Sequence, residues 1–307
     1  MTNILIADDN PVDRALLQGI LKNHAPPQWH VEAVASASEA VDRVQKGVDS
    51  ASSKQPVQRP AILVTDLQMP GINGLELITQ VKKIDPALPI LLITNSDNVD
   101  IAMSALRAGA TSFSPKSSLA TDLVTTIKQV LEVAQRMRYT HSQSFCAVPD
   151  HQAFVLENES SLIGPTIENL QSGLPSWSHR DRLQIGMAIE EALTNAMHHG
   201  NLEVCSKLRE GDSDSKYYQT IAERKQLGKF RGRKVRVEAE FSDEHICIQI
   251  SDEGAGFDPA SIPDPRCSEN LERVSGRGLL LIRSFMDQVA HNAIGNQITM
   301  TKMRNPV

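Results

Sequence analysis

One stretch of the sequence, residues 191–201, carries side chains that could hold a divalent cation. It follows an apolar run with helical spacing, so Glu191, Asn195 and His199, each four residues apart, would share one helix face. A carboxylate and a carboxamide offer the hard oxygen ligands that Mg²⁺ prefers, and phosphates or waters can supply the others. Polar residues at this spacing are also typical of a solvated helix face, so the stretch alone does not decide between the two.

Two glycine motifs further along the chain could bind a nucleotide. The first is Asp252, Gly254 and Gly256 after a strand-like apolar run, and the second is Gly276 and Gly278 at the start of an apolar helix. Glycine lets backbone N–H groups approach phosphate oxygens, and the N-terminus of a helix favours anions. An aspartate just past a strand can accept a hydrogen bond from an exocyclic amine such as that of adenine.

The order of these motifs resembles the nucleotide site of the gyrase, heat-shock chaperone, histidine kinase and MutL ATPase superfamily. Over about residues 145–305, the segments Glu-Ala-Leu-Thr-Asn, Asp-Glu-Gly-Ala-Gly-Phe and Gly-Arg-Gly-Leu-Leu-Leu-Ile look most like its anti-sigma-factor serine/threonine kinase branch. The resemblance implies an α+β sandwich that binds ATP and Mg²⁺, with Asn195 on the metal, Asp252 on the adenine amine and Glu191 as general base. It also implies four glycines that shape the pocket and its lid: Gly254, Gly256, Gly276 and Gly278.

Three further residues stand near these motifs. His199 is expected to hold the end of the helix rather than take part in chemistry. Arg277 either stabilises phosphate charge or lies on the surface. Asn296 stands after Gly295 where the resembling family often carries a threonine near adenine, which leaves that contact open.

A second set of reactive residue types lies in the N-terminal part of the chain, where short apolar runs are expected to form buried strands. At or just past the ends of these runs stand Asp8, Asp9, Asp66, Thr94 and Lys116. Because the carboxyl ends of parallel strands meet at one edge of a sheet, these residues should lie together. Clustered acids can hold Mg²⁺, and aspartate can accept a phosphoryl group covalently. Acids that merely cap helices would not account for all five positions.

With the segment Asp66-Leu-Gln-Met-Pro-Gly-Ile-Asn-Gly, this pattern resembles the response-regulator receiver domain. The resemblance implies that Asp66 takes the phosphoryl group and that Thr94 and Lys116 contact it. It implies a Mg²⁺ site made by the acids Asp8, Asp9 and Asp66 and the carbonyl of Gln68, and Phe113 as an aromatic switch. Two positions depart from the family, Asn95 after Thr94 and Ser117 after Lys116; the second removes the usual reason to expect a cis peptide there.

The pattern of elements predicts two domains of different classes. Strands and helices alternate through residues 1–120, which predicts a doubly wound parallel sheet with helices on both faces. A helix over residues 121–142 would link this receiver domain to an ATP-binding domain at residues 143–307. In the second domain we expect adjacent antiparallel strands at 235–241 and 245–250, a helix at 282–289 and a closing strand near 297–302.

The predicted linker helix carries an apolar stripe, Leu119, Leu123, Ile127, Val130, Ala134 and Met137. Its heptad-like spacing favours either a signalling helix that pairs in a homodimer or a helix whose first half packs on the receiver. Residues 202–232 form a charged insertion whose basic residues are interspersed with acids. We expect a solvated helix near residues 216–226, open to a protein partner, rather than a nucleic-acid patch.

Composition sets broad limits. The 307 residues exceed the usual size of one domain, and 40% of them are hydrophobic, enough for two cores. The net charge of −6 argues against nucleic acid as the main partner. The four cysteines form no paired motif, and no apolar run reaches the roughly 20 residues that cross a bilayer. With no leader in view, we expect a soluble cytoplasmic protein with reduced thiols.

Two functions of different classes follow. The first is a serine/threonine protein kinase that also binds a sigma factor or an anti-anti-sigma protein, gated when an upstream histidine kinase phosphorylates Asp66. The second is a switch that captures partners and holds ATP without using it. A hybrid histidine kinase is disfavoured because His141 lacks the flanking acid of such motifs, and a DNA-binding regulator because no basic helix-turn-helix follows the receiver.

Overall fold

The computed structural model of the chain describes residues 2–49, 59–95, 99–140, 150–205, 208, 214–259 and 277–304. The chain divides into two compact units, Met1–Ala134 and Gln135–Val307. The division falls inside the helix predicted to link two domains. Gly276, His141 and most of the predicted lid lie outside the described residues.

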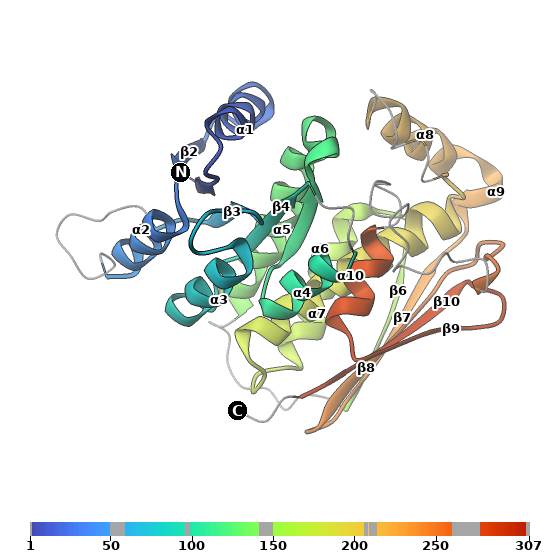
Figure 1. The fold of residues 1–307 in the computed structure, drawn as a ribbon. Helices are drawn as coiled ribbons and strands as arrows, with labels where there is room; N and C mark the ends of the chain where they lie inside the picture. Colours follow the sequence, from blue (N-terminus) through green and yellow to red (C-terminus); the bar gives the residue numbers. More distant parts are fainter. Residues whose placement is uncertain are drawn as a thin grey trace. The chain divides into compact units, whose positions relative to one another are not determined.

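The first unit is a parallel five-stranded sheet with the strand order β2-β1-β3-β4-β5 (Figure 1). Its strands are β1 (Thr2–Ala7), β2 (Trp29–Val34), β3 (Ile62–Asp66), β4 (Ile90–Thr94) and β5 (Ser112–Pro115). Its helices are α1 (Pro11–His24), α2 (Ala37–Asp49), α3 (Gly74–Ile84), α4 (Val99–Ala108), the short 3₁₀ turn η2 (Lys116–Ser118) and α5 (Leu119–Thr140). The predicted doubly wound fold is confirmed.

The strand order explains where chemistry can collect in this unit. β3 and β4 are buried along their whole length, as expected for central parallel strands covered on both faces. After β2 the order reverses, so right-handed crossovers place α1 on one face and α2, α3 and α4 on the other. The carboxyl ends of β1 and β3, which are neighbours at this reversal, therefore border an open crevice.

Local capping starts the helices directly after these strand ends. The side chain of Asn10 accepts a hydrogen bond from the backbone N–H of Val12, and Pro11 occupies the first turn of α1, as the sequence predicts. Asn73 and Glu76 form a capping box at the start of α3. Both helices thus begin close to the sheet edge that carries the acids.

Helix α5 is continuous over 22 residues, which confirms the long helix predicted after the receiver. Five members of its apolar stripe are buried: Leu119, Leu123, Ile127, Val130 and Ala134. The side chain of the sixth, Met137, lies outside the described part. The pairing of this helix in a dimer stays a prediction.

The second unit has an antiparallel five-stranded sheet with the order β6-β7-β8-β10-β9, covered by helices. Its strands are β6 (His151–Leu156), β7 (Val235–Phe241), β8 (His245–Ser251), β9 (Gln288–His291) and β10 (Gln297–Met303). Its helices are the turn η3 (Ser160–Leu162), α6 (Ile163–Ser172), α7 (His179–Thr194), the π-helix η4 (Asn195–Asn201), α8 (Asp214–Gln226), α9 (Gly228–Arg231) and α10 (Arg277–Phe285). α7 packs against both α6 and α10. The predicted α+β class is confirmed.

One expectation for this unit is wrong, and another holds only in part. The helix predicted at 282–289 ends at Phe285, and Gln288–His291 form the strand β9, which pairs with β10. The stretch from Glu191 to His199 is not one α-helix, because the π-helix begins at Asn195. A π-helix has more residues per turn, so the four-residue spacing no longer places His199 directly above Asn195.

Within the described residues, no helix combines the length and the apolar composition needed to span a membrane.

Candidate functional sites

Three acids meet at the reversal point of the parallel sheet. Asp8 follows β1 and Asp66 ends β3, and both are buried, whereas Asp9 reaches solvent. One carboxylate oxygen from each of the three lies within 4.8 Å of the others. Asp8 Oδ1 accepts from the backbone N–H of Asn10 at 2.8 Å, and Asp66 Oδ1 accepts from that of Leu67 at 2.7 Å. These bonds use Oδ1 of Asp8 and of Asp66 and leave Oδ2 of both residues for other contacts.

Lys116 brings a positive charge into this cluster. Its Nζ donates to Asp66 Oδ2 at 3.1 Å and lies 3.5 Å from Asp8 Oδ2. Its shortest contact is to Asp13 Oδ2, at 2.6 Å. The end of β5 thus supplies the lysine, and α1 supplies a further carboxylate.

The electrostatics of the cluster suit a cation. Burial raises the pKa of Asp8, and the charges of Asp66 and Asp13 add to this, although the N–H of Asn10 and the charge of Lys116 act against it. Burial alone would lower the pKa of Lys116, but its contacts with Asp13 and Asp66 outweigh burial and raise it. Asp8 Oδ2 is buried and accepts no hydrogen bond from the described part of the chain. Mg²⁺ would satisfy that oxygen, so the residues fit the predicted metal site.

The other predicted receiver residues lie on, or just after, neighbouring strands of the same sheet. Thr94 is buried at the end of β4, opposite Pro115 in the register of β4 with β5. Gln68 is exposed in the loop after β3. Phe113 is 1% exposed, so the predicted switch residue points inward. No cis peptide occurs in the residues that the structure describes.

Sequence reasoning missed Asp13. It lies in the first turn of α1, and its pairing with Lys116 joins residues 103 positions apart. The available signal was its place four residues after Asp9 at the start of a helix that begins at the sheet edge. Helix residues about one turn apart share a face, so a residue at this position lies on the side of the helix that faces the strand ends.

We expect Asp13→Asn to speed the phosphorylation of Asp66 by a small phosphoryl donor about two- to fivefold. The change removes the shortest contact of Lys116, a partly exposed ion pair of about 0.5–1 kcal/mol, and frees the ammonium to meet the phosphoryl group. The initial rate of phosphorylation measures this effect. In a Lys116→Met background Asp13→Asn should change nothing, and slower phosphorylation in the single variant would contradict the assignment.

In the second unit, the backbone of α10 lies against the side chains of Glu191 and Asn195. A Cβ added to Gly278 would lie 2.6 Å from Glu191 Oε2 and 3.8 Å from Asn195 Nδ2. Glu191 lies in the last turn of α7 and Asn195 begins the π-helix. The structure therefore brings together three predicted residues from two distant motifs.

Asp252 lies at the other end of the π-helix. A Cβ on Gly200 would clash with the Asp252 carboxylate at 2.5 Å or less, and one on Gly254 would lie 2.8 Å from Asp252 Oδ1. That oxygen accepts from the N–H of Gly254 at 2.8 Å. Burial raises the pKa of Asp252 to about 6, although the N–H of Gly254 and the charge of Arg233 act against the shift. A half-buried acid with this pKa, enclosed by glycine backbone, is suited to accept a hydrogen bond from a ligand amine.

Gly256 and Gly295 hold two loops of this site together. Both have left-handed backbone, with φ of +73° and +80°. A Cβ on Gly256 would lie 2.1 Å from the carbonyl oxygen of Ile294, so only glycine fits. Asn296 donates from Nδ2 to the backbone carbonyl of Asp252 at 3.3 Å. The residue at this position therefore supports the end of β8.

Gly256→Ala should lower the stability of the second unit by about 1–3 kcal/mol, because it combines a positive φ with a clash against backbone. The midpoint of urea unfolding, followed by a probe in that unit, measures this loss. Gly228→Ala is the matched control, since a Cβ there meets nothing within 4 Å. Equal midpoints for the two variants would show that the Gly256 loop is not fixed as described.

Two more residues at the end of the π-helix escaped the sequence reasoning. Asn201 is fully buried, accepts from the N–H of Glu253 at 2.7 Å and donates to Asn158 at 2.8 Å, so it fixes the segment that carries Asp252. Gly200 provides the flat surface under the Asp252 carboxylate. Both lie inside the stretch 191–201, but their types and spacing did not indicate these contacts. The structural part expected of His199 is confirmed, because its Nδ1 donates to the carbonyl of Val204 at 2.7 Å.

The arrangement fits a nucleotide. Gly254 and Gly278 place backbone in direct contact with Asp252 and with Glu191, where a Cβ would clash, and the π-helix η4 links Asn195 at its start to Gly200, which lies against Asp252, near its end. A ligand with an amine at one end and metal-bound phosphates at the other would match both ends.

Family comparisons agree with this division of the chain. Residues 4–128 match the family model for the response regulator receiver domain. Residues 220–302 match the family model for the histidine kinase-like ATPase domain. The two domains are therefore fused in one chain. The second match includes Asp252 and Gly278 but begins after Glu191 and Asn195, so the placement of these two depends on the geometry described above.

Among the curated relatives, the C4-dicarboxylate transport transcriptional regulatory protein DctD of Pseudomonas aeruginosa is 32% identical over 132 residues, which are 43% of this chain and 26% of that protein. The response regulator MprA of Mycobacterium avium is 30% identical over 128 residues, 42% of this chain and 50% of that protein. The matches thus span a quarter to a half of these relatives.

Among solved structures, a CheY-like response regulator receiver domain protein from Methanospirillum hungatei is 22% identical, with a TM-score of 0.37. The match covers 44% of this chain and 98% of that one.

Proposed function

We propose that this chain, a response regulator receiver domain fused to a histidine kinase-like ATPase domain, is a two-component regulator whose output is an ATP-dependent serine/threonine protein kinase. An upstream histidine kinase supplies the phosphoryl group for Asp66. The kinase unit acts on an anti-anti-sigma protein and binds a sigma factor, and the state of Asp66 gates both.

In the receiver, Asp66 Oδ2 is the nucleophile. It attacks the phosphorus of a phosphohistidine or a small phosphoryl donor, the bond from phosphorus to the donor breaks, and the donor leaves with that electron pair. Lys116, 3.1 Å from Asp66 Oδ2, pairs with the added negative charge, and the hydroxyl of Thr94 donates to it. Asp8, Asp9, Asp66 and the Gln68 carbonyl would hold Mg²⁺, which supplies charge neutralisation when bound.

In the second unit, Asp252 accepts a hydrogen bond from the adenine amine of ATP, and the backbone at Gly254 and Gly256 shapes the base end of the pocket. Asn195 would hold Mg²⁺ at the phosphates. Gly276 and Gly278 admit the phosphate oxygens to the start of α10, where the helix dipole favours anions. Glu191 takes the proton from a serine or threonine hydroxyl of the substrate protein as that oxygen attacks the γ-phosphorus and ADP leaves.

The proposal of a kinase is carried by one observation, the contact of Gly278 with the carboxylate of Glu191 beside Asn195. A general base must lie within reach of the phosphate end of the pocket, and this contact supports that position for Glu191. A pocket that only held ATP would need Asn195 and Asp252 but no carboxylate at Gly278.

The test is transfer of label from [γ-³²P]ATP to a candidate anti-anti-sigma protein, with nucleotide binding measured in parallel. Glu191→Gln should abolish transfer and keep ATP binding, because the carboxamide retains the volume but takes no proton. Glu238→Gln, an exposed acid on β7, is the matched control and should behave as the wild type. Tight binding by the wild type without transfer would favour the capture switch instead, and no binding would contradict both.

Gating is tested in the same assay. Transfer, and the affinity for the sigma factor, are compared with and without a phosphoryl donor for Asp66. A change of either quantity in the wild type that is absent in Asp66→Asn supports gating. If transfer and affinity were the same with and without the donor, phosphorylation of Asp66 would not gate the second unit.

A further inference from the structure

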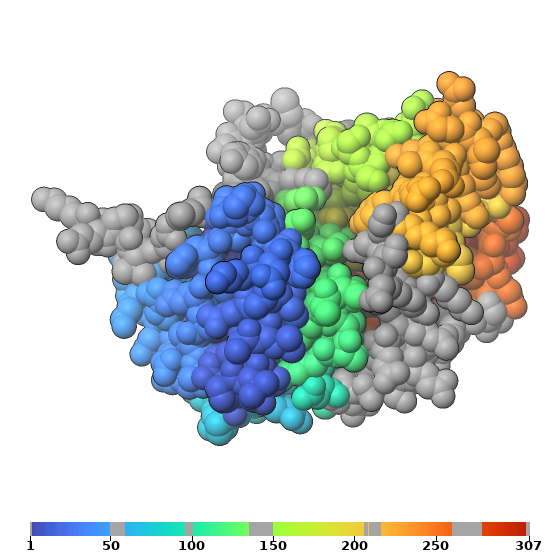
Figure 2. Space-filling model, turned by 90° about the horizontal axis from the view of Figure 1, so that it is seen from above, coloured from blue at the N-terminus to red at the C-terminus, as the bar shows by residue number. Residues whose placement is uncertain are grey.

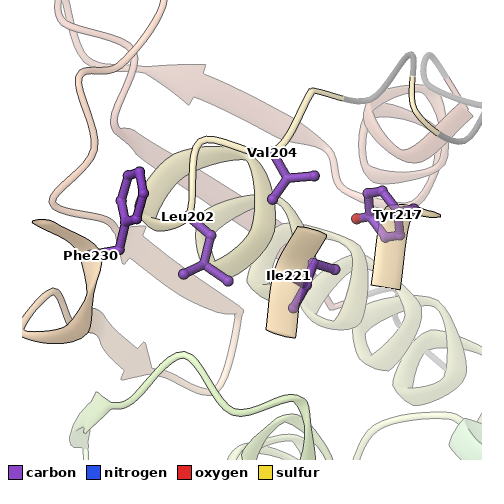
Figure 3. Close-up of a cluster of buried hydrophobic side chains, with 5 residues drawn as sticks. All are labelled: Leu202, Val204, Tyr217, Ile221 and Phe230. Carbon is purple, nitrogen blue, oxygen red and sulfur yellow. The ribbon is translucent and has the colours of Figure 1, made fainter. Parts of the chain in front are cut away.

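The charged insertion predicted at residues 202–232 contains the expected helix, α8, whose outer face is exposed, and the inner face of this helix packs towards the π-helix that carries Asn195. Its residues build a small hydrophobic cluster from the loop after η4, from α8 and from α9, as Figure 3 shows: Leu202, Val204, Tyr217, Ile221 and Phe230. Tyr217 is fully buried. The gold to orange part of the chain, which includes α8 and α9, lies at the surface of the second unit (Figure 2). The inner face of the insertion is thus a core, and its outer face is open.

Polar contacts tie this cluster to the π-helix. The Tyr217 hydroxyl and His198 Nδ1 share a buried hydrogen bond of 3.0 Å, and the other ring nitrogen of His198 lies 3.3 Å from Ser160 Oγ. The rings of His198 and Tyr217 meet edge to face. Arg224, also on α8, donates to the backbone carbonyl of Leu202 at 2.8 Å.

A basic residue directly after the insertion holds the last residue of η4. Arg233 donates to the carbonyl of Asn201 at 2.8 Å and pairs with Glu203 at 2.9 Å. Glu203 has a φ of +52°, an unusual value for a residue other than glycine. The chain leaves the π-helix through a strained residue that the insertion keeps in place.

The π-helix in turn carries parts of both ends of the nucleotide site. Asn195 begins it, Gly200 lies under the carboxylate of Asp252, and Asn201 accepts from the N–H of Glu253. A π-helix is less favourable than an α-helix and persists where surrounding contacts stabilise it. Contacts that hold this segment therefore set the positions of Asn195 and Asp252 together.

We infer that Tyr217 is a positioning residue for the nucleotide pocket, because it fixes the middle of the π-helix through His198. The inference rests on the proposed binding of ATP. We call the insertion, residues 202–232, the brace of the pocket. Its buried face fixes the position of η4. Asn195 and Asp252 therefore keep their spacing only while the contacts of the brace are in place.

The test compares Tyr217→Phe with Tyr218→Phe. The first removes the hydroxyl that meets His198 and keeps the ring in the cluster, whereas the second removes a hydroxyl from a neighbouring side chain that is 48% exposed. Tyr217→Phe should weaken ATP binding about three- to tenfold, the effect of one buried hydrogen bond. It should also lower the ratio of ATP affinity to GTP affinity, since Asp252 would no longer be held against the base. Tyr218→Phe should leave both values unchanged.

Amide hydrogen exchange provides a readout that does not need nucleotide. In Tyr217→Phe the amides of Leu202 and Glu253, which bond to Met197 and Asn201, should exchange about tenfold faster than in Tyr218→Phe. If the wild type binds no ATP, the proposed function fails, and faster exchange in Tyr217→Phe alone still supports the brace. Equal exchange in the two variants, or a lower unfolding midpoint with an unchanged ratio of ATP to GTP affinity, would overturn the inference.

Discussion

Asp66→Asn should abolish covalent phosphorylation of the chain, lowering label from a small phosphoryl donor at least 100-fold, to background. A carboxamide cannot form the acyl phosphate, and no other described acid combines burial with a lysine at 3.1 Å and two further carboxylates within 4.8 Å. The remaining contacts should survive, because the carboxamide oxygen of the variant can still accept from the N–H of Leu67. Loss of uptake without loss of folding is therefore expected.

Asp42→Asn is the matched control for this variant, since Asp42 is an exposed acid on α2 of the same unit. It should take up label at the wild-type rate. Label that resists base treatment, or uptake retained in Asp66→Asn, would place the phosphoryl group on another residue. Far-ultraviolet circular dichroism and the unfolding midpoint establish that Asp66→Asn is folded, because removing one of three crowded acids should not lower its stability.

Asp252→Asn should have opposite effects on binding and on stability. Nucleotide affinity should fall about 10- to 100-fold, the effect of losing a hydrogen bond to a charged acceptor in a half-buried site. The unfolding midpoint of the second unit at pH 7.5 should rise by about 2–4 °C. The rise is expected because the carboxamide of the variant keeps the contact to the N–H of Gly254 but carries no charge that burial penalises.

The sign of this effect depends on pH. The pKa of Asp252 rises from 3.8 to about 6 on folding, so between these values the folded chain binds more protons than the unfolded chain. The stabilising contribution of the protonated acid is complete below about pH 4 and is lost as the pH rises through 6. The variant should therefore exceed the wild type in stability at pH 7.5, and the difference should vanish near pH 4.

The pH dependence of binding provides a second measurement. The carboxylate form accepts from the adenine amine, so wild-type affinity for ATP should fall as the pH drops below about 6. In Asp252→Asn this dependence should be absent. Asp243→Asn, an exposed acid in the turn after β7, is the control and should resemble the wild type in both stability and binding. If Asp252→Asn were less stable than the wild type at pH 7.5, the charge of Asp252 would not be destabilised by burial.

The sequence alone predicted the fold classes and most of the residues that meet at the two sites. Buried parallel strands appear as apolar runs, and their carboxyl ends must share one edge, so the positions of Asp8, Asp66 and Lys116 along the chain suffice to predict that they meet. The motifs at Asp252 and Gly278 were found for a related reason. Glycine at close backbone contacts and an acid past a strand are local requirements that one short segment can meet.

Tertiary structure decided what no short segment encodes. The periodicity of residues 191–199 is compatible with an α-helix, whereas the π-helix at Asn195 is held by tertiary contacts that include those from the insertion and from Asp252. The strand β9 is four residues long, too short for an alternating pattern to reveal, and it exists because the turn at Gly295 returns the chain to it.

The contacts of Asp13 and Tyr217 belong to the same class. Each joins its partner across a large separation in sequence, Lys116 for Asp13 and His198 for Tyr217, and each side chain is ordinary in its own helix. Hydrophobic spacing determines which face of a helix is buried, but not which polar group on another element it will meet. That choice is made when the elements pack, because a buried polar group must find a partner wherever the fold provides one.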